Sequence, residues 1–159
     1  MKKEIIQVLS NHYFKNIELG VYYLDLAKQA NDFGMVNLSK YIINLSNDKM
    51  VTHKNLIYNY FLESGEDLVG NLSQINFKKF ENPKQLVENI CFIEEEIKKD
   101  VNLIADKLLE QKAHESYNFW QWFIKDVLKD FGEILYIKDL FSMSDDMLLI
   151  DHMIEKNVK

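Results

Sequence analysis

Residues 87–108, with the sequence VENICFIEEEIKKDVNLIADKL, decide the fold class. Apolar side chains recur in this stretch at steps of three and four residues, which places them on one face of an α-helix. Only one residue on that face, Glu94, is polar. The face consists of Val87, Ile90, Glu94, Ile97, Val101, Ile104 and Leu108. An unpaired carboxylate is costly to bury, so Glu94 needs a partner inside the protein.

Three other segments have the same helical period. Together with the first, they predict helices over about Glu4 to Ala30, Met35 to Glu63, Pro83 to Lys112 and Glu115 to Leu140. Asn82 and Pro83 are typical of a helix start, and Gly65 is typical of a helix end. Ser144 together with Asp145 can cap a helix, which predicts a short last helix, Asp146 to Lys156. The sequence therefore predicts an all-α protein, a four-helix bundle with one short additional helix.

Residues 66–82 have no sustained helical period. An extended chain covers roughly 3.3 Å per residue, so this link is long enough to run back along a bundle. The second and third helices then point in the same direction, as they do in bundles with one long crossover. No repeat, low-complexity stretch or linker interrupts the 159 residues. We therefore expect a single domain over residues 1–159.

The composition of the chain argues against some binding partners and favours one cellular location. The formal net charge is −6 and every basic residue is a lysine, which argues against nucleic-acid binding. No stretch approaches the roughly 18 apolar residues of a membrane-spanning helix, and the apolar run near the start is shorter than in a signal peptide. Cys91 is the only cysteine, so no internal disulfide can form. These features predict a cytoplasmic protein.

Polar residues also fall on the inward faces of the other three helices. His53 and Asp130 lie on the second and fourth helices, and Asn16 lies on the first. Glu94, His53 and Asp130 are near the midpoints of their helices, so we expect them at one height. Carboxylates and an imidazole between facing helices are typical of sites for iron, zinc or manganese. The alternatives stay open: an inward histidine is more often a hydrogen-bonded core residue, and Asp130 at a helix edge can be solvated.

The start of the fourth helix resembles a known family. Residues 117–123, Tyr-Asn-Phe-Trp-Gln-Trp-Phe, are close to the Phe-Asn-Phe-Leu-Gln-Trp-Tyr motif of non-haem bacterial ferritins. Gly65 follows His53 at the family's distance, and residues 147–151 resemble its short fifth helix. The resemblance covers the whole chain and is weakest in the first third. It implies a ferritin-like four-helix bundle with a long crossover between helices 2 and 3 and a short fifth C-terminal helix.

The ferritin metal ligands carry over position by position. By this resemblance the second-helix histidine falls on His53 and the third-helix glutamate on Glu94. The bridging glutamate of the family falls on Met50, which cannot bridge two cations. The fourth-helix glutamine and glutamate fall on Val127 and Asp130. The resemblance therefore implies a metal site made of His53, Glu94 and Asp130, and it implies that the di-iron centre is incomplete.

The first-helix ligand is ambiguous. The local match, residues 16–19, favours Glu18, whereas helical phase places Asn16 inside and Glu18 outside. We prefer Asn16. Glu133 is a further candidate beside Asp130. A solvated charged face is the better explanation for the remaining neighbouring acids, which are Glu95, Glu96, Asp100 and Asp126.

The family's function sets the expected activity. The resemblance implies iron storage or sequestration in a homo-oligomeric cage of 24 subunits, with Fe²⁺ oxidation by O₂ as the ferroxidase reaction. Because Met50 removes the bridging carboxylate, we expect that oxidation to be weak or absent. The alternatives are a ferritin-fold scaffold without iron chemistry and a DNA-protecting mini-ferritin. Haem is not expected, because Met50 is better explained as a residue that fills the core.

Overall fold

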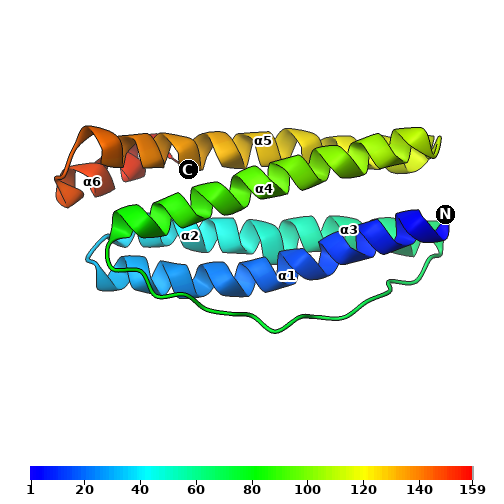
Figure 1. Ribbon diagram of the computed structural model, residues 1–159, viewed down its shortest axis with the longest axis horizontal. Coiled ribbons are helices and arrows are strands. Elements are labelled where there is room, and N and C mark those ends of the chain that lie inside the picture. Colours follow the sequence, from blue (N-terminus) through cyan, green and yellow to red (C-terminus); the bar gives the residue numbers. More distant parts are fainter. Residues whose placement is uncertain (159) are drawn as a thin grey trace.

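The computed structural model describes residues 1–158, which form helices and irregular segments and no strand. The helices are α1 (Lys3–Asp32), α2 (Val36–Asn47), α3 (Lys54–Ser64), α4 (Pro83–Glu110), α5 (His114–Met143) and α6 (Met147–Asn157), with a π-helix, η1 (Asp48–His53), between α2 and α3. Because α2, η1 and α3 are continuous, they form one rod (Figure 1). The predicted all-α bundle with a short last helix is confirmed. None of these helices is long and apolar enough to cross a membrane.

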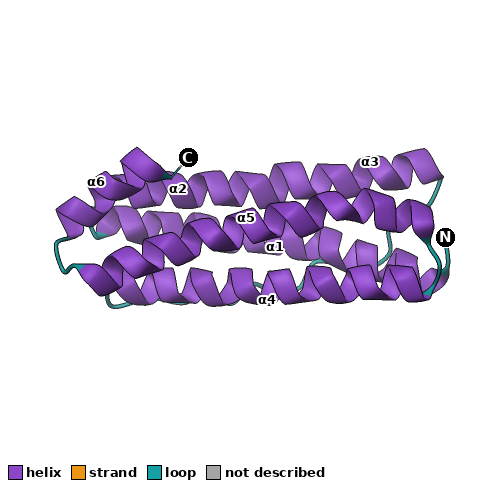
Figure 2. Cartoon of the chain, turned by 90° about the horizontal axis from the view of Figure 1, so that it is seen from above, coloured by secondary structure: helices purple, strands orange, loops and turns teal. Residues whose placement is uncertain are grey.

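The four long elements form two antiparallel hairpins that lie side by side. One hairpin consists of α1 and the α2–η1–α3 rod, and the other consists of α4 and α5 (Figures 1 and 2). The link over residues 65–82 returns along the bundle, so the rod and α4 point in the same direction. This confirms the long crossover predicted from the missing helical period.

Side chains of α1 hold the crossover in place. Ser10, Glu18 and Gln29, which are spaced along α1, each bind backbone groups of the link. Gln29 donates to one backbone carbonyl at 2.7 Å and accepts from a backbone N–H at 3.0 Å. The link lacks secondary structure of its own, so these contacts satisfy part of its backbone.

The ends of the rod and the start of α4 follow the sequence signals. Gly65 ends α3 in the left-handed conformation, with φ 71°, which a glycine adopts without strain. The Asn82 side chain accepts a hydrogen bond from the Gln85 N–H at 2.9 Å, and Pro83 occupies the first helical position. These two predicted boundaries are confirmed.

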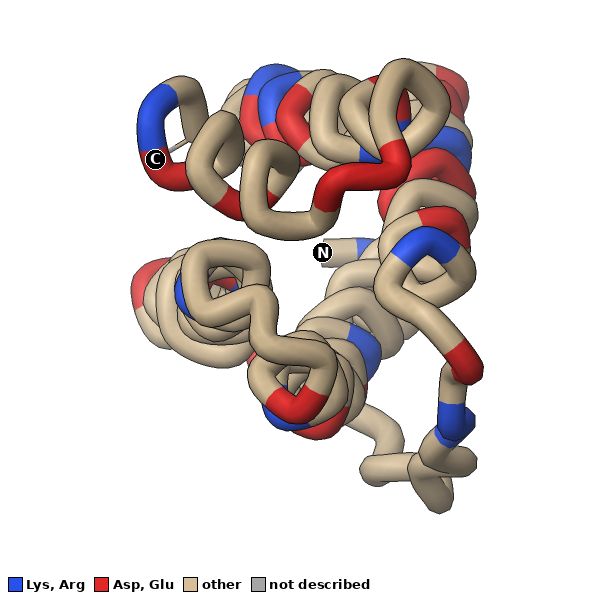
Figure 3. Tube along the Cα trace, turned by 90° about the vertical axis from the view of Figure 1, so that its left-hand side faces the viewer, with Lys and Arg blue, Asp and Glu red and all other residues tan. Residues whose placement is uncertain are grey.

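The last helix begins slightly later than expected. The cap predicted at Ser144 with Asp145 is wrong: the Asp146 side chain caps α6 by accepting from the Leu149 N–H at 3.2 Å. The Ser144 hydroxyl instead accepts from the Asp146 N–H, which shapes the turn before the helix. Figure 3, viewed along the bundle, shows α6 folded back at one end.

The core lies along the shared axis of the two hairpins. On α4, the apolar positions 87, 90, 97, 101 and 108 are at most 2 % exposed, and Glu94 among them is 1 % exposed. The Trp120 indole donates to the Val101 carbonyl at 2.9 Å, so this buried polar group is satisfied. The apolar core is therefore interrupted near its middle by a polar layer.

Candidate metal centre

The π-helix η1 changes which residues of the rod face the interior. A π-turn holds more residues than an α-turn, and it brings Lys49 and His53, four apart, to the same face. Both are 0 % exposed. Met50, which we expected to fill the core, is not among the fully buried residues of η1. Met50 is half-buried and packs against Gly20, where an added methyl would lie 1.8 Å from its Cγ.

Lys49 is the partner that the buried Glu94 requires. The Lys49 Nζ lies 3.0 Å from Glu94 Oε1 and 3.0 Å from Asp130 Oδ2. The contact with Asp130 is also an aligned hydrogen bond, whereas the contact with Glu94 is an ion pair without that alignment. Tyr23 donates to Glu94 Oε2 at 2.9 Å. Each of the four long elements thus contributes one residue to this group. We call it the lysine cluster: Tyr23, Lys49, Glu94 and Asp130.

The lysine in this cluster is charged. Burial disfavours the ammonium, but the negative charges of Glu94 and Asp130 outweigh burial and raise the pKa of Lys49. The pKa of Tyr23 is also raised, first by burial and then by the Glu94 charge, so the phenol keeps its proton and remains a donor. The centre of the bundle therefore holds a fixed positive charge that the protein itself supplies.

A second cluster lies beside the first, between η1 and α5. His53 Nε2 lies 3.1 Å from Asp48 Oδ2 and 2.6 Å from Asp126 Oδ2. Together with Asp130, these side chains offer four ligand atoms within 4.8 Å of one another. We call this group the histidine cluster: Asp48, His53, Asp126 and Asp130. A cavity of about 150 Å³ lies beside Asp48 and Asp130, between α2 and α5.

The neighbouring charges and the burial of the histidine cluster shift the pKa values of its members in different directions. Burial lowers the pKa of His53, but hydrogen bonds to Asp126 and Asp48 outweigh it, so the net shift is upward. Burial opposes the charge on Asp48, yet the bond to His53 lowers its pKa to about 2. Burial raises the pKa of Asp130 to about 7, against the effect of Lys49. A cation entering this cluster must therefore displace protons.

The three ligands named from the sequence do lie in the interior, but they divide between two clusters. Glu94 belongs to the lysine cluster and His53 to the histidine cluster, while Asp130 belongs to both. Val127 is buried at 2 % exposure and offers no ligand atom. Whether His53, Glu94 and Asp130 bind metal stays a prediction.

Of the weaker candidates, Asn16 and Glu18 make their contacts elsewhere, whereas Glu133 lies beside the histidine cluster. Asn16 is buried, and its amide donates to the His12 carbonyl at 2.8 Å within α1. Glu18 binds the backbone of the crossover at Ser73. Glu133 lines the small cavity, and burial raises its pKa. Nothing in these contacts places Asn16 or Glu18 beside His53.

Sequence reasoning missed two acids of the histidine cluster. Asp126 was assigned to a solvated face, but it lies four residues before Asp130 on α5, a spacing that places both on one side. This four-residue spacing can be read from the sequence, so the sequence alone could have grouped Asp126 with Asp130. Asp48 lies five residues before His53, and this spacing brings side chains together only in a π-helix.

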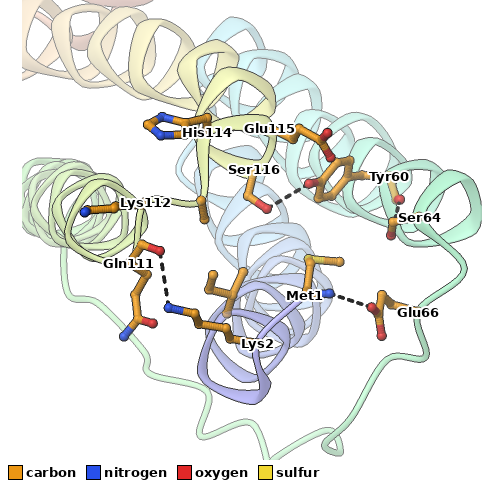
Figure 4. A pocket seen from close by; sticks show the side chains of 12 residues that line it. Met1, Lys2, Tyr60, Ser64, Glu66, Gln111, Lys112, His114, Glu115 and Ser116 are labelled. Atoms are coloured by element: carbon orange, nitrogen blue, oxygen red, sulfur yellow. Dashed lines mark hydrogen bonds and ion pairs between the residues drawn. The ribbon is translucent and has the colours of Figure 1, made fainter.

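A larger cavity, about 550 Å³, lies at the end of the bundle where α1 begins and α4 turns into α5 (Figure 4). Its wall includes a hydrogen bond between the Tyr60 and Ser116 hydroxyls, 2.8 Å long, and one from Lys2 to the Gln111 carbonyl. None of the residues of the two clusters lines it. These contacts tie the helix ends together at a distance from the polar layer.

Solved structures with the same architecture define the class of fold. A crystal structure of the ferritin of M. penetrans matches with a TM-score of 0.92 and 20 % sequence identity, covering 99 % of this chain and 98 % of that one. A humanized archaeal ferritin matches with a TM-score of 0.88 and 17 % identity, covering 98 % and 96 %. The protein therefore has the ferritin fold. No family model matches the sequence.

Two curated relatives define the family. The uncharacterized protein UU427 of Ureaplasma parvum serovar 3 is 38 % identical over 159 residues, covering 99 % of this chain and 93 % of that protein. The UU427 homolog of Ureaplasma urealyticum is 35 % identical and covers 99 % and 92 %. The chain belongs to the UU427 family.

Within the ferritin fold, the lysine cluster does not fit a pair of metal ions. The two buried carboxylates of the neighbouring helices α4 and α5, Glu94 and Asp130, are both in contact with the Lys49 ammonium. A divalent cation in the same place would meet this positive charge. The histidine cluster offers one histidine nitrogen and three carboxylates, which suit a single ion such as Fe²⁺, Mn²⁺ or Zn²⁺.

Proposed function

We propose that this is a ferritin-like protein that sequesters iron and binds one divalent cation per chain in the histidine cluster. The observation that carries the proposal is the convergence of four ligand atoms, from η1 and α5, within 4.8 Å of one another. The mixture of carboxylates and imidazole suits iron. The ferritin-like motif at residues 117–123 favours iron over the other divalent metals.

The residues of the cluster have separate roles in this proposal. His53 would hold the ion through Nε2, after releasing the proton on that nitrogen to solvent. Asp126, 2.6 Å from that nitrogen, exchanges its contact with the imidazolium for one with the ion. Asp48 and Asp130 border the small cavity, so they face the side from which the ion enters. Only one ion is held, so rapid oxidation of iron in pairs is weak or absent.

Anaerobic titration with Fe²⁺ tests the site. We expect one ion per chain in the wild type and binding at least about tenfold weaker in His53→Ala and Asp126→Asn, because each loses a ligand. His152→Ala and Glu95→Gln are matched controls, since both residues are exposed and lie outside the cluster. If His53→Ala and Asp126→Asn both bound Fe²⁺ with wild-type affinity, this would contradict the proposed metal site.

Stopped-flow mixing of the protein with Fe²⁺ in air tests the activity. The expected trace is a slow absorbance increase with no rapid phase. A rapid phase that consumes two irons per chain would overturn the proposed loss of paired oxidation.

We also propose that the protein assembles with copies of itself, as a ferritin-like cytoplasmic cage of 24 subunits. The support is a group of exposed apolar residues around the start of α6: Met143, Met147, Leu148 and Leu149, exposed by 79, 45, 82 and 50 %. Exposed apolar residues that are this close in the chain are typical of a protein interface. In sedimentation velocity, Leu148→Lys is expected to give smaller species, whereas Leu128→Lys, an exposed leucine on α5, is expected to keep the full assembly. A full assembly in Leu148→Lys would contradict this interface.

A second candidate is a ferritin-fold scaffold that takes up no iron. The charged Lys49 at the centre favours it, because a fixed cation repels metal ions. Size-exclusion chromatography with iron staining separates the two. An assembly that stains after incubation with Fe²⁺ supports sequestration, and an assembly of the same size that stays unstained supports the scaffold.

A further inference from the structure

The lysine cluster has the form of a cation site whose cation is attached to the chain. Two carboxylates from different helices, Glu94 on α4 and Asp130 on α5, each lie 3.0 Å from the Lys49 Nζ. The three residues are at most 5 % exposed. Carboxylates at this depth require a positive partner, and in this chain the ammonium is that partner.

The surroundings of the ammonium also suit a metal ion. Tyr23 fixes the orientation of the Glu94 carboxylate through a hydrogen bond to Oε2, which leaves Oε1 directed at Lys49. Asp130 is shared between the lysine cluster and the histidine cluster, so the two positions are adjacent. A carboxylate at position 49 would add a third oxygen ligand to those of Glu94 and Asp130. Oxygen-rich sites of this kind suit Mn²⁺ and Fe²⁺.

We propose that Lys49 determines the metal stoichiometry of the bundle centre. Its ammonium occupies the position of a second divalent cation beside the histidine cluster. The wild-type chain therefore holds one ion, and replacing the ammonium with a carboxylate opens the second position. The first ion rests on the proposed function, whereas the opening of the second position depends only on Lys49, Glu94 and Asp130.

Mn²⁺ alone is the probe, with bound ions counted by equilibrium dialysis and free Mn²⁺ followed by electron paramagnetic resonance. We expect one ion per chain in the wild type and two in Lys49→Glu, with a spin-coupled signal from the adjacent pair. Lys40→Glu is the matched control, because it makes the same charge change at an exposed position of α2 that lines neither cavity. It is expected to keep one ion. The double variant Lys49→Glu/Glu94→Gln is expected to return to one ion, because it removes a carboxylate of the second position.

A neutral variant keeps the test decisive if Lys49→Glu does not fold. Lys49→Gln removes the ammonium without adding charge, and it is expected to bind one more ion than the wild type, with lower affinity than Lys49→Glu. Circular dichroism establishes which variants are folded. Folded Lys49→Gln that binds no more ions than the wild type would overturn the proposal, as would a second ion in Lys49→Glu that survives Glu94→Gln. If the wild type binds no ion but Lys49→Glu binds one that requires Glu94, the proposed function fails and the role of Lys49 stands.

Discussion

Lys49 and Glu94, on opposite hairpins of the bundle, form a 3.0 Å ion pair in which neither residue is more than 1 % exposed. Such a pair gains little net stability over well-packed apolar residues, because both charges lose their hydration. Its effect is on specificity: the pair requires Lys49 to face inward, and η1 is the local structure that allows this together with an inward His53. The π-helix and the ion pair therefore depend on each other.

Removing the lysine should be costly because it leaves two buried carboxylates unpaired. For Lys49→Met we expect a loss of about 3–5 kcal/mol in the free energy of unfolding, measured by urea denaturation without metal. Lys129→Met, at an exposed position, should change it by less than about 0.5 kcal/mol. Lys49→Met/Glu94→Gln should recover part of the loss. A double variant as unstable as the single one would show that the cost does not come from the unpaired charge.

Metal binding should depend on pH in a defined direction. Burial raises the pKa of Asp130 to about 7, and hydrogen bonds to Asp126 and Asp48, against burial, raise that of His53, so both groups hold protons at pH 6. Ligands must lose these protons before they bind a cation. The affinity for Mn²⁺ should therefore rise by at least about tenfold between pH 6 and pH 8. Equilibrium dialysis at fixed ionic strength measures it, and an affinity that stays level across this range would contradict the assignment of His53 and Asp130 as ligands.

The helices and their order could be predicted because their signals are local. Residues 87–108 repeat with the α-helical period, so their buried face follows from the sequence, and Glu94 within that face already required a partner. Gly65 and Asn82 bound the crossover through backbone conformations and hydrogen bonds that involve only neighbouring residues. Those signals do not depend on the rest of the chain.

The set of residues that meet at the centre of the bundle could not be predicted in the same way. A π-turn has no sequence signature of its own, and it shifted the inward position from Met50 to Lys49. The same shift brought Asp48 to His53. The partner of Glu94 therefore became visible only when the geometry of η1 was known, although the need for one followed from burial alone.

The contact between Gly20 and Met50 should make this part of α1 intolerant of even one methyl group. The new Cβ of Gly20→Ala would lie 1.8 Å from Met50 Cγ, so we expect a loss of about 1–3 kcal/mol in the free energy of unfolding. Gly132→Ala is the control, because its added methyl has no atom within 4 Å beyond its chain neighbours and the nearby backbone of its own helix. That variant should gain about 0.5–1 kcal/mol from the better helix propensity of alanine. Thermal or urea unfolding measures both, and Gly20→Ala/Met50→Ala should be more stable than Gly20→Ala if the clash is the cause.

One carboxylate of the last helix acts as a cap for a different helix. Met35 precedes α2 and has no capping group, but Asp151 of α6 accepts hydrogen bonds from the Asn37 N–H at 3.0 Å and the Leu38 N–H at 2.9 Å. These are donors that a local cap would otherwise satisfy. Because Asp151 lies on α6, the same two bonds hold α6 against the bundle.

Asp151→Ala should therefore have two separable effects. The free energy of unfolding should fall by about 1–2 kcal/mol, the usual cost of losing a helix cap. Amide hydrogen exchange in α6 should accelerate more than in α4, because α6 loses two of its bonds to α2 while the core of α4 is unchanged. Asp139→Ala, at an exposed position on α5, should leave both measurements at their wild-type values.

If the exposed apolar residues of α6 mediate self-association, loosening this helix should also weaken the assembly in sedimentation velocity. If Asp151→Ala keeps the full assembly while amide hydrogen exchange in α6 is rapid, the interface lies elsewhere and the capping role of Asp151 still stands.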